Sequence, residues 1–488
     1  MSICRREFGA CLLGGMAAGW LPAASPRTRL TVLVLVESLR ADSVDGGNPQ
    51  LASGGFRRLL EKGAWFPDCR HLSSTFSACG IANLATGAWP SQHGIVADSW
   101  YDRAAGRAVA ASSEDLLATT LGAQAVAAGA RVSVVALTRA HAALFGGTRG
   151  ARLFFLDERG RFAASGVAPE WLDSYNQSKP PEAARGAAWM AVNAAPDAPP
   201  LRTLTFDGER PQEFLSLYQA SPFGQTALFD FAGELVGRDK LGQGDHPDLL
   251  CILDGSAALL GYETGGRSPL MSQMVLQLDR RLETLLNLLS RAVGENGFNL
   301  ALSAAHGAPP EPAAAARPRM AVAGEAIAQA VESGIKSFGS HVEKYVYPFL
   351  YLKGGEGAPE NFRLAAARAA MEQAAVAGFY TARGACSTHD GWEQRFRNSF
   401  HMKRSGDVML SYRPEYVEDF GAGRGVSYGS LYNYDARVPL CFYGPQFRSG
   451  VFESPVEAVD LAPTLARVMG IAEPSSAAGR VLGEALAL

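Results

Sequence analysis

The sequence predicts an α/β fold with a doubly wound, mostly parallel sheet flanked by helices. Short, continuous runs of branched apolar residues recur along the chain, as in strands that are buried on both faces of a parallel sheet. Segments with the apolar spacing of helices lie near these runs, and this alternation is typical of doubly wound sheets. In such sheets the functional groups gather at the carboxyl ends of the strands.

The first strand is predicted at residues 30–36, which read Leu-Thr-Val-Leu-Val-Leu-Val. Similar apolar runs predict further strands at 131–137, 247–253, 298–303 and 439–443. Helical spacing predicts helices at 55–62, 271–289 and, in an Ala-rich segment, 362–377. Two stretches, at about 150–245 and 309–406, differ in composition and are interpreted as insertions that cap the sheet.

Composition excludes some classes of protein. The 488 residues contain 45 Lys and Arg against 48 Asp and Glu, a net charge of −3, which excludes a nucleic-acid binder built on backbone electrostatics. Hydrophobic residues make up 47% and charged residues 19% of the chain, so a buried core is expected rather than disorder.

The N-terminus has the layout of an export signal at residues 1–25. Arg5-Arg6 precedes an apolar run at 9–20 and then small residues, which indicates twin-arginine export and a periplasmic or secreted protein. The alternative is an uncleaved anchor, but the run is shorter than the roughly 20 residues of a spanning helix. No transmembrane segment is expected after the signal. Residues 26–488 are then predicted to form a single domain.

Five cysteines remain after this signal: Cys69, Cys79, Cys251, Cys386 and Cys441. An odd number leaves at least one free thiol, and their wide spacing argues against a metal knuckle. Whether Cys69 pairs with Cys79 stays open.

Several common catalytic motifs are absent. The sequence has no GxxxxGK[ST] loop and no HExxH, and neither a GxSxG elbow nor a GxGxxG directly follows a predicted strand. Their absence removes the commonest hydrolase, nucleotide triphosphatase, zinc protease and dinucleotide-binding interpretations.

A different set of motifs is present, in a fixed order from residue 30 to the C-terminus. The segments are 54–60, 74–80 (Ser-Thr-Phe-Ser-Ala-Cys-Gly), 85–95, 100–103, 302–307 (Leu-Ser-Ala-Ala-His-Gly), 429–439 and 460–465. They resemble the alkaline phosphatase superfamily, most closely the branch of type I phosphodiesterases, nucleotide pyrophosphatases and periplasmic alkaline phosphatases. The resemblance implies hydrolysis of phosphate esters at two zinc ions by a Ser or Thr nucleophile.

The resemblance places the nucleophile at Ser77 and the first zinc beside it. This zinc is expected to take an acidic residue after the first strand and an Asp-His pair, which fall at Glu37, Ala305 and His306. Glu37 is one methylene longer than the usual Asp, and Ala305 offers no ligand. Glu37, Ser77 and His306 are therefore predicted to hold at most one metal ion.

The second zinc has lost its ligands. Its expected positions fall at Ala258, Tyr262 and Tyr428. Alanine has no donor atom, and a neutral tyrosine is a poor substitute for imidazole on zinc. Asp254 at a strand end, or residues of the insertions, are left open as replacement ligands.

Groups that hold the substrate have changed too. Asp98 stands where the family has Asn and is expected to repel a phosphoryl group. The Lys-x-Arg clamp of the monoesterases is reduced to Arg139, at a shifted position. His141, His389 and His401 match no ligand position and are expected at the surface or in loops.

Each retained residue also has a purely structural interpretation. Ser77 is a candidate cap of the helix that follows it, His306 a packed structural histidine, and Glu37 a partner of helix N–H groups. Tyr262 and Tyr428 are then expected to fill the volume of the lost zinc.

The sequence thus predicts an exported, catalytically impaired relative of metal-dependent phosphate-ester hydrolases that keeps a binding role. Its partner would be a phosphate-ester ligand or a periplasmic protein. The alternative is an active phosphomonoesterase or phosphodiesterase that uses Ser77 with one metal ion or with rescued ligands, so whether the chain is an enzyme stays open.

Overall fold

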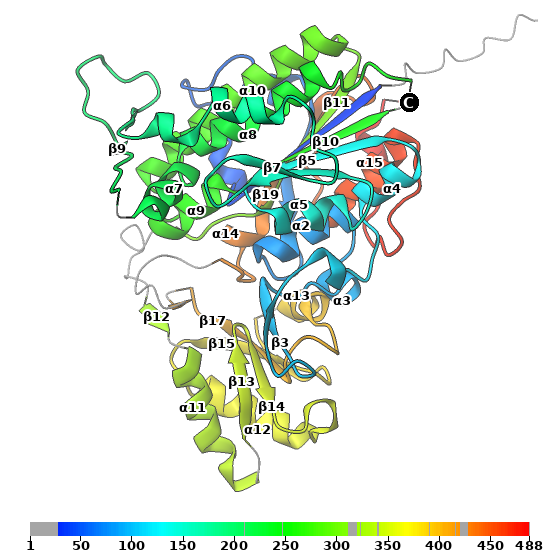
Figure 1. The fold of residues 1–488 in the computed structure, drawn as a ribbon. Coiled ribbons are helices and arrows are strands. Elements are labelled where there is room, and N and C mark those ends of the chain that lie inside the picture. The colour runs from blue at the N-terminus through cyan, green and yellow to red at the C-terminus, as the bar shows by residue number, and fades with distance from the viewer. Residues whose placement is uncertain are drawn as a thin grey trace, which may run out of the picture.

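The computed structural model describes residues 28–208, 210–245, 247–310, 320–322, 324–338, 341–389, 391–414, 416–419 and 428–487. The predicted export signal at 1–25 lies outside these residues. The remainder folds around a large sheet, with a smaller sheet below it in Figure 1.

The large sheet has ten strands. They are β1 (Leu30–Glu37), β2 (Ala64–Arg70), β5 (Arg131–Ala136), β6 (Arg152–Leu156), β7 (Phe162–Ser165), β10 (Asp248–Asp254), β11 (Phe298–His306), β19 (Arg437–Tyr443), β20 (Gly450–Val451) and β21 (Val456–Glu457). Their order is β20-β2-β19-β11-β1-β10-β5-β6-β7, with β21 also pairing β2. The neighbours from β11 through β1, β10 and β5 to β6 are parallel, whereas β19 and β7 run antiparallel to their inner neighbours.

This sheet confirms the predicted α/β class and the predicted strands. β1 is buried along its whole length, as its unbroken apolar sequence requires. The helix predicted at 362–377 is shorter than expected, because α12 (Glu360–Met371) ends before β15 (Val376–Thr381) begins. At the end of that segment, Ala374 and Ala375 lie in the turn between them and Ala377 lies in β15.

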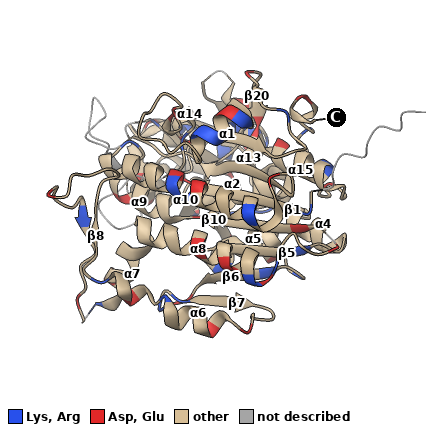
Figure 2. Cartoon of the chain, turned by 90° about the horizontal axis from the view of Figure 1, so that it is seen from above, with Lys and Arg blue, Asp and Glu red and all other residues tan. Residues whose placement is uncertain are grey.

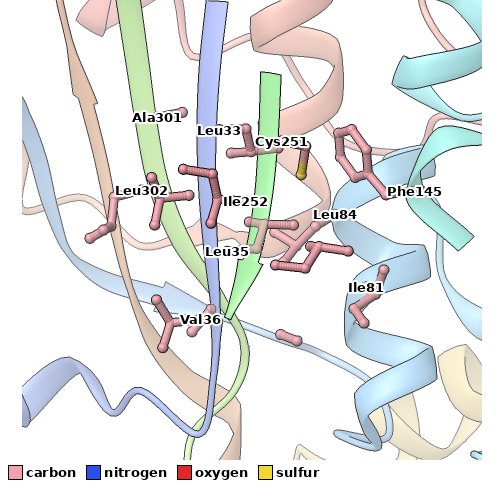
Figure 3. Close-up of a cluster of buried hydrophobic side chains, with 14 of the residues drawn as sticks. Leu33, Leu35, Val36, Ile81, Leu84, Phe145, Cys251, Ile252, Ala301 and Leu302 are labelled. Carbon is pink, nitrogen blue, oxygen red and sulfur yellow. The ribbon is translucent and has the colours of Figure 1, made fainter. Parts of the chain in front are cut away.

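Helices cover both faces of the large sheet, either directly or by packing on the helices that do so (Figure 1). They are α1 (Phe56–Lys62), α2 (Ser77–Thr86), α3 (Pro90–His93), α4 (Leu121–Ala127), α5 (Arg139–Gly146), α6 (Leu172–Ser178), α7 (Pro211–Gln219), α8 (Pro222–Arg238), α9 (Ser256–Thr264), α10 (Pro269–Val293) and α15 (Leu461–Met469). Figure 3 shows how Ile81 and Leu84 of α2 pack with Phe145 of α5 against side chains of β1 and β10. This core fixes α2 relative to the ends of the central strands.

The smaller sheet has five strands in the order β13-β14-β17-β15-β16. Its remaining strands are β13 (Val342–Val346), β14 (Phe349–Leu352), β16 (Cys386–Ser387) and β17 (Val408–Tyr412). With α11 (Gly324–Ile335) and α12 it encloses a second core, which includes Val331, Leu350 and Phe362. Short elements complete the description: β3 (Ser99–Asp102) with β4 (Arg107–Ala110), β8 (Ala188–Trp189) with β9 (Arg202–Thr203), β12 (Met320–Val322) with β18 (Tyr416–Glu418), α13 (Trp392–Ser399) and α14 (Asn433–Ala436).

Charged side chains of both signs are mixed over the helices seen in Figure 2. Within the described ranges, no helix combines the length and the apolar character that crossing a bilayer demands. The five cysteines of the described chain all carry free thiols, so Cys69 and Cys79 are not paired.

Candidate active site

Glu37 and His306 lie next to each other at the carboxyl ends of β1 and β11. The strands are parallel neighbours, and an irregularity of register after Val36 pairs Glu37 with His306. Both side chains are buried. The fold therefore brings together two residues that the sequence assigns to one metal site, at the sheet edge where doubly wound folds carry their functional groups.

Helix α2 begins at Ser77 and packs its first turn against the end of β11. This close approach depends on Gly80, because a Cβ at that position would lie 1.9 Å from the carbonyl oxygen of Ala305. With no side chain in the way, the helix backbone contacts the strand backbone. The Ser77 hydroxyl consequently lies 3.0 Å from Nε2 of His306.

The contacts of His306 fix its tautomer. Its Nδ1 lies 2.6 Å from the carbonyl oxygen of Gly307, which can only accept, so Nδ1 carries the proton. Burial lowers the pKa of His306, so the ring is neutral near neutral pH and Nε2 has a free lone pair. The Ser77 hydroxyl donates to that lone pair. A serine bonded to a neutral imidazole in this way is set up for loss of its proton.

Asp98, and not Ser77, caps α2. Phe76 holds the N-cap position without a side-chain bond, and the N–H of Ala78 donates to Oδ1 of Asp98 at 2.8 Å. Burial raises the pKa of Asp98, whereas the Ala78 bond and the positive charge of His141 lower it. The Asp98 carboxylate thus occupies the anion-binding end of the helix.

A buried chain of hydrogen bonds anchors α2 to the sheet. Nδ1 of His93 accepts from the N–H of Ile95, so Nε2 donates to Oδ1 of Asn83 at 2.8 Å. The amide nitrogen of Asn83 donates to Nδ1 of His71, whose Nε2 donates to the carbonyl oxygen of Ala304 at 2.9 Å. Burial lowers the pKa of His71 to about 4 and that of His93 to about 3, which keeps both rings neutral.

Glu37 is paired with His141 of α5. Nδ1 of His141 donates to Oε1 of Glu37 at 3.0 Å, and the side chains are 27% and 5% exposed. Burial alone would raise the pKa of Glu37, but His141, His306 and Ser77 lower it to about 2. Burial alone would lower the pKa of His141, but Glu37 and Asp98 raise it to about 9. The pair is a carboxylate and an imidazolium at neutral pH.

The tyrosines at predicted ligand positions border a cavity. Tyr262 lies on α9, four residues after the buried Ala258, and Tyr428 stacks on the ring of His306 at 4.2 Å between centroids. Both tyrosines line a cavity of about 350 Å³, together with Asp98. Burial raises the pKa of both phenols, so they are neutral.

Two other candidate residues lie away from this cavity. Arg139 is exposed at the start of α5 and does not line it. Asp254 is fully buried, where its carboxylate accepts from Gln225 at 2.6 Å and from the N–H of Ser256 at 3.0 Å. Both oxygens of Asp254 are thus engaged by the start of α9 and by α8.

Known proteins share this fold and this sequence pattern. The profile of the family "Type I phosphodiesterase / nucleotide pyrophosphatase" matches residues 31–423. The chain belongs to this family. It is 24% identical to the alkaline phosphatase PafA of Elizabethkingia meningoseptica, across 98% of each chain, and 23% identical to the alkaline phosphatase PhoV of Synechococcus elongatus, across 95% and 94%.

Solved structures confirm the fold. The crystal structure of wild-type PafA covers 95% of this chain and 100% of its own, with a TM-score of 0.84 at 22% identity. Murine ectonucleotide pyrophosphatase / phosphodiesterase 5 covers 94% of this chain and 99% of its own, with a TM-score of 0.57 at 14% identity.

The family is metal-dependent, and the donor set of this chain does not fit a two-metal centre. Among the described residues, no three His, Cys, Asp or Glu side chains converge to hold a metal ion. Glu37 is bonded to His141, Nε2 of His306 faces Ser77, and the predicted positions at Ala258 and Ala305 have no donor atom. Each structural zinc or catalytic zinc needs at least three protein ligands.

Sequence reasoning missed two features of this site. It placed His141 at the surface, although the residue follows a predicted strand closely enough to reach the functional edge of the sheet. The available signal was Thr138, which caps the start of α5 by accepting from the N–H of His141 and so places His141 in the first turn of that helix. Phe76 and Tyr347 also line the cavity, and Tyr347 comes from the smaller-sheet region, which no local pattern brings to α2.

Proposed function

We propose that this chain is a catalytically impaired member of its family that binds a ligand at the ends of β1 and β11. The observation that carries the proposal is the Glu37–His141 pair. An imidazolium already neutralises the carboxylate that the resemblance assigns to the first zinc. A bound cation would have to displace it and leave His141 beside a like charge.

The other substituted positions support the same proposal. Ala258, Tyr262, Ala305 and Tyr428 replace ligand positions, so at most one zinc ion is expected. The ligand is proposed to be a phosphate ester, as the family and its alkaline phosphatase relatives indicate, or a protein partner. With the export signal predicted at 1–25, this role belongs in the periplasm or outside the cell.

The test is hydrolysis of p-nitrophenyl phosphate and of bis(p-nitrophenyl) phosphate by the purified chain in zinc-containing buffer. We expect rates that equal those of Ser77→Ala. Turnover in the ordinary enzyme range of about 1–10³ s⁻¹, lost in Ser77→Ala, would contradict the proposal.

One observation favours the alternative, an active esterase that uses Ser77. The hydroxyl of Ser77 is bonded to the neutral Nε2 of His306, which is the arrangement of a serine and its general base. Activity that is lost in both Ser77→Ala and His306→Ala would support it. A chelator then separates its two forms: loss of activity indicates a single metal ion at Glu37 and His306, and retention indicates a metal-independent Ser–His pair.

A further inference from the structure

The cavity beside Ser77 is walled by aromatic rings. Phe76, Tyr262, Tyr347 and Tyr428 line its volume of about 350 Å³, which lies within the range of roughly 300–1,000 Å³ of small-molecule sites. These rings come from four separate segments of the chain. Their convergence is therefore a property of the tertiary fold and not of one amphipathic element.

The wall is held in place by its surroundings. The rings of Phe76 and Tyr347 meet edge to face, with centroids 5.8 Å apart. The backbone of Gly429, at a φ of 106°, packs so closely that a Cβ there would lie 2.4 Å from the Phe76 ring. The ring of Tyr428 stacks on the imidazole of His306, with centroids 4.2 Å apart. A preformed aromatic surface loses little conformational entropy when it binds a ligand.

The only charged side chain among the residues described as lining this cavity is Asp98. Its Oδ1 accepts from the N–H of Ala78, so the carboxylate is fixed in position at the cavity wall. Glu37 and His141 nearby form a pair of opposite charges. The local charge is thus negative, which disfavours anions and favours cations.

We propose that the aromatic cavity binds a small organic cation, such as a quaternary ammonium group, with Asp98 as its counter-ion. Aromatic faces attract cations through the ring quadrupole, and several rings around one cation form the usual cage for quaternary ammonium ligands. A carboxylate in the wall adds direct charge pairing. This inference rests on the proposed function, the binding of a ligand at the ends of β1 and β11, and adds that the ligand carries a cationic group.

The test compares three probes by isothermal titration calorimetry at constant ionic strength: choline, dimethylbutanol and inorganic phosphate. Dimethylbutanol has the shape of choline, but carbon replaces the charged nitrogen. We expect choline to bind at least about tenfold more tightly than either other probe. Equal binding of choline and dimethylbutanol, or tighter binding of phosphate, would overturn the proposal.

Two matched variants locate the site. In Asp98→Asn the amide oxygen still accepts from Ala78, so the helix cap remains while the charge is lost, and choline affinity should fall by about tenfold or more. Asp102→Asn is the control: Asp102 also accepts backbone N–H groups, from Ala104 and Ala105, but does not line the cavity. It should bind choline as the wild type does. An equal loss of choline affinity in both variants, or no loss in either variant, would contradict the proposed site.

A third variant tests the aromatic wall without disturbing the core. Tyr262 is half-buried on α9, so Tyr262→Leu should fold and should weaken choline binding severalfold while leaving the weak binding of dimethylbutanol unchanged. Unchanged choline affinity would exclude this ring from the cage. The hydrolysis assay is independent of these titrations: choline binding by an active hydrolase would refute the proposed loss of catalysis but keep the cation site.

Discussion

At the scale of single residues, the Glu37–His141 pair neutralises a buried carboxylate at the carboxyl end of β1. A buried carboxylate is costly unless it is paired and hydrogen-bonded. His141 supplies the opposite charge and the hydrogen bond, and the Glu37 carboxylate raises the pKa of His141. Because Glu37 is paired with His306 and bonded to His141, we propose that the pair also influences which ions bind at the strand ends.

His141→Ala should therefore destabilise the protein. The variant leaves the charge of Glu37 buried without its partner, which should lower the free energy of unfolding by about 1–3 kcal/mol. The measurement is urea denaturation near neutral pH. His389→Ala is the control, because His389 is exposed and a surface change should stay within about 0.5 kcal/mol. Equal stability of the two variants would show that the Glu37–His141 contact contributes nothing.

At the scale of elements, the contact between α2 and β11 positions Ser77. The sequence alone predicts the strands well, because short unbroken apolar runs are typical of strands that are buried on both faces of a parallel sheet. The sequence does not predict the contact between α2 and β11. Position 80 requires glycine only because the backbone of Ala305 lies so close to it in the folded chain. The length of α12 was overestimated for a related reason: an Ala-rich segment has high helix propensity, and tertiary structure overrides propensity.

Gly80→Ala should disrupt that contact. The added methyl group meets backbone and not a flexible side chain, so α2 must move, at a cost of about 1–3 kcal/mol or more. Gly237→Ala is the matched control, since it lies in α8 with nothing within 4 Å of the added Cβ, and it should stabilise the protein by about 0.5–1 kcal/mol. Thermal unfolding of both variants checks this. The same small stabilisation in both would refute the close packing of α2 on β11.

At the scale of the whole molecule, the fold follows from sequence pattern, whereas the site depends on long-range placement. Glu37, Ser77 and His306 were predicted as neighbours through the family motifs, and the structure brings them together. His141 and Tyr347 could not be placed in this way. Their roles depend on how α5 and the smaller-sheet region meet the strand ends, and no local periodicity encodes that geometry.

We propose that the strand ends of this family member do not form a two-metal centre. The most direct test is the zinc content per chain, measured by plasma mass spectrometry on the purified protein after dialysis against zinc without a chelator. We predict at most one zinc per chain, and His141→Ala as a second sample should not lower that value, since it frees Glu37. Two zinc ions per wild-type chain would contradict the claim, because they would require ligands that the described residues do not bring together.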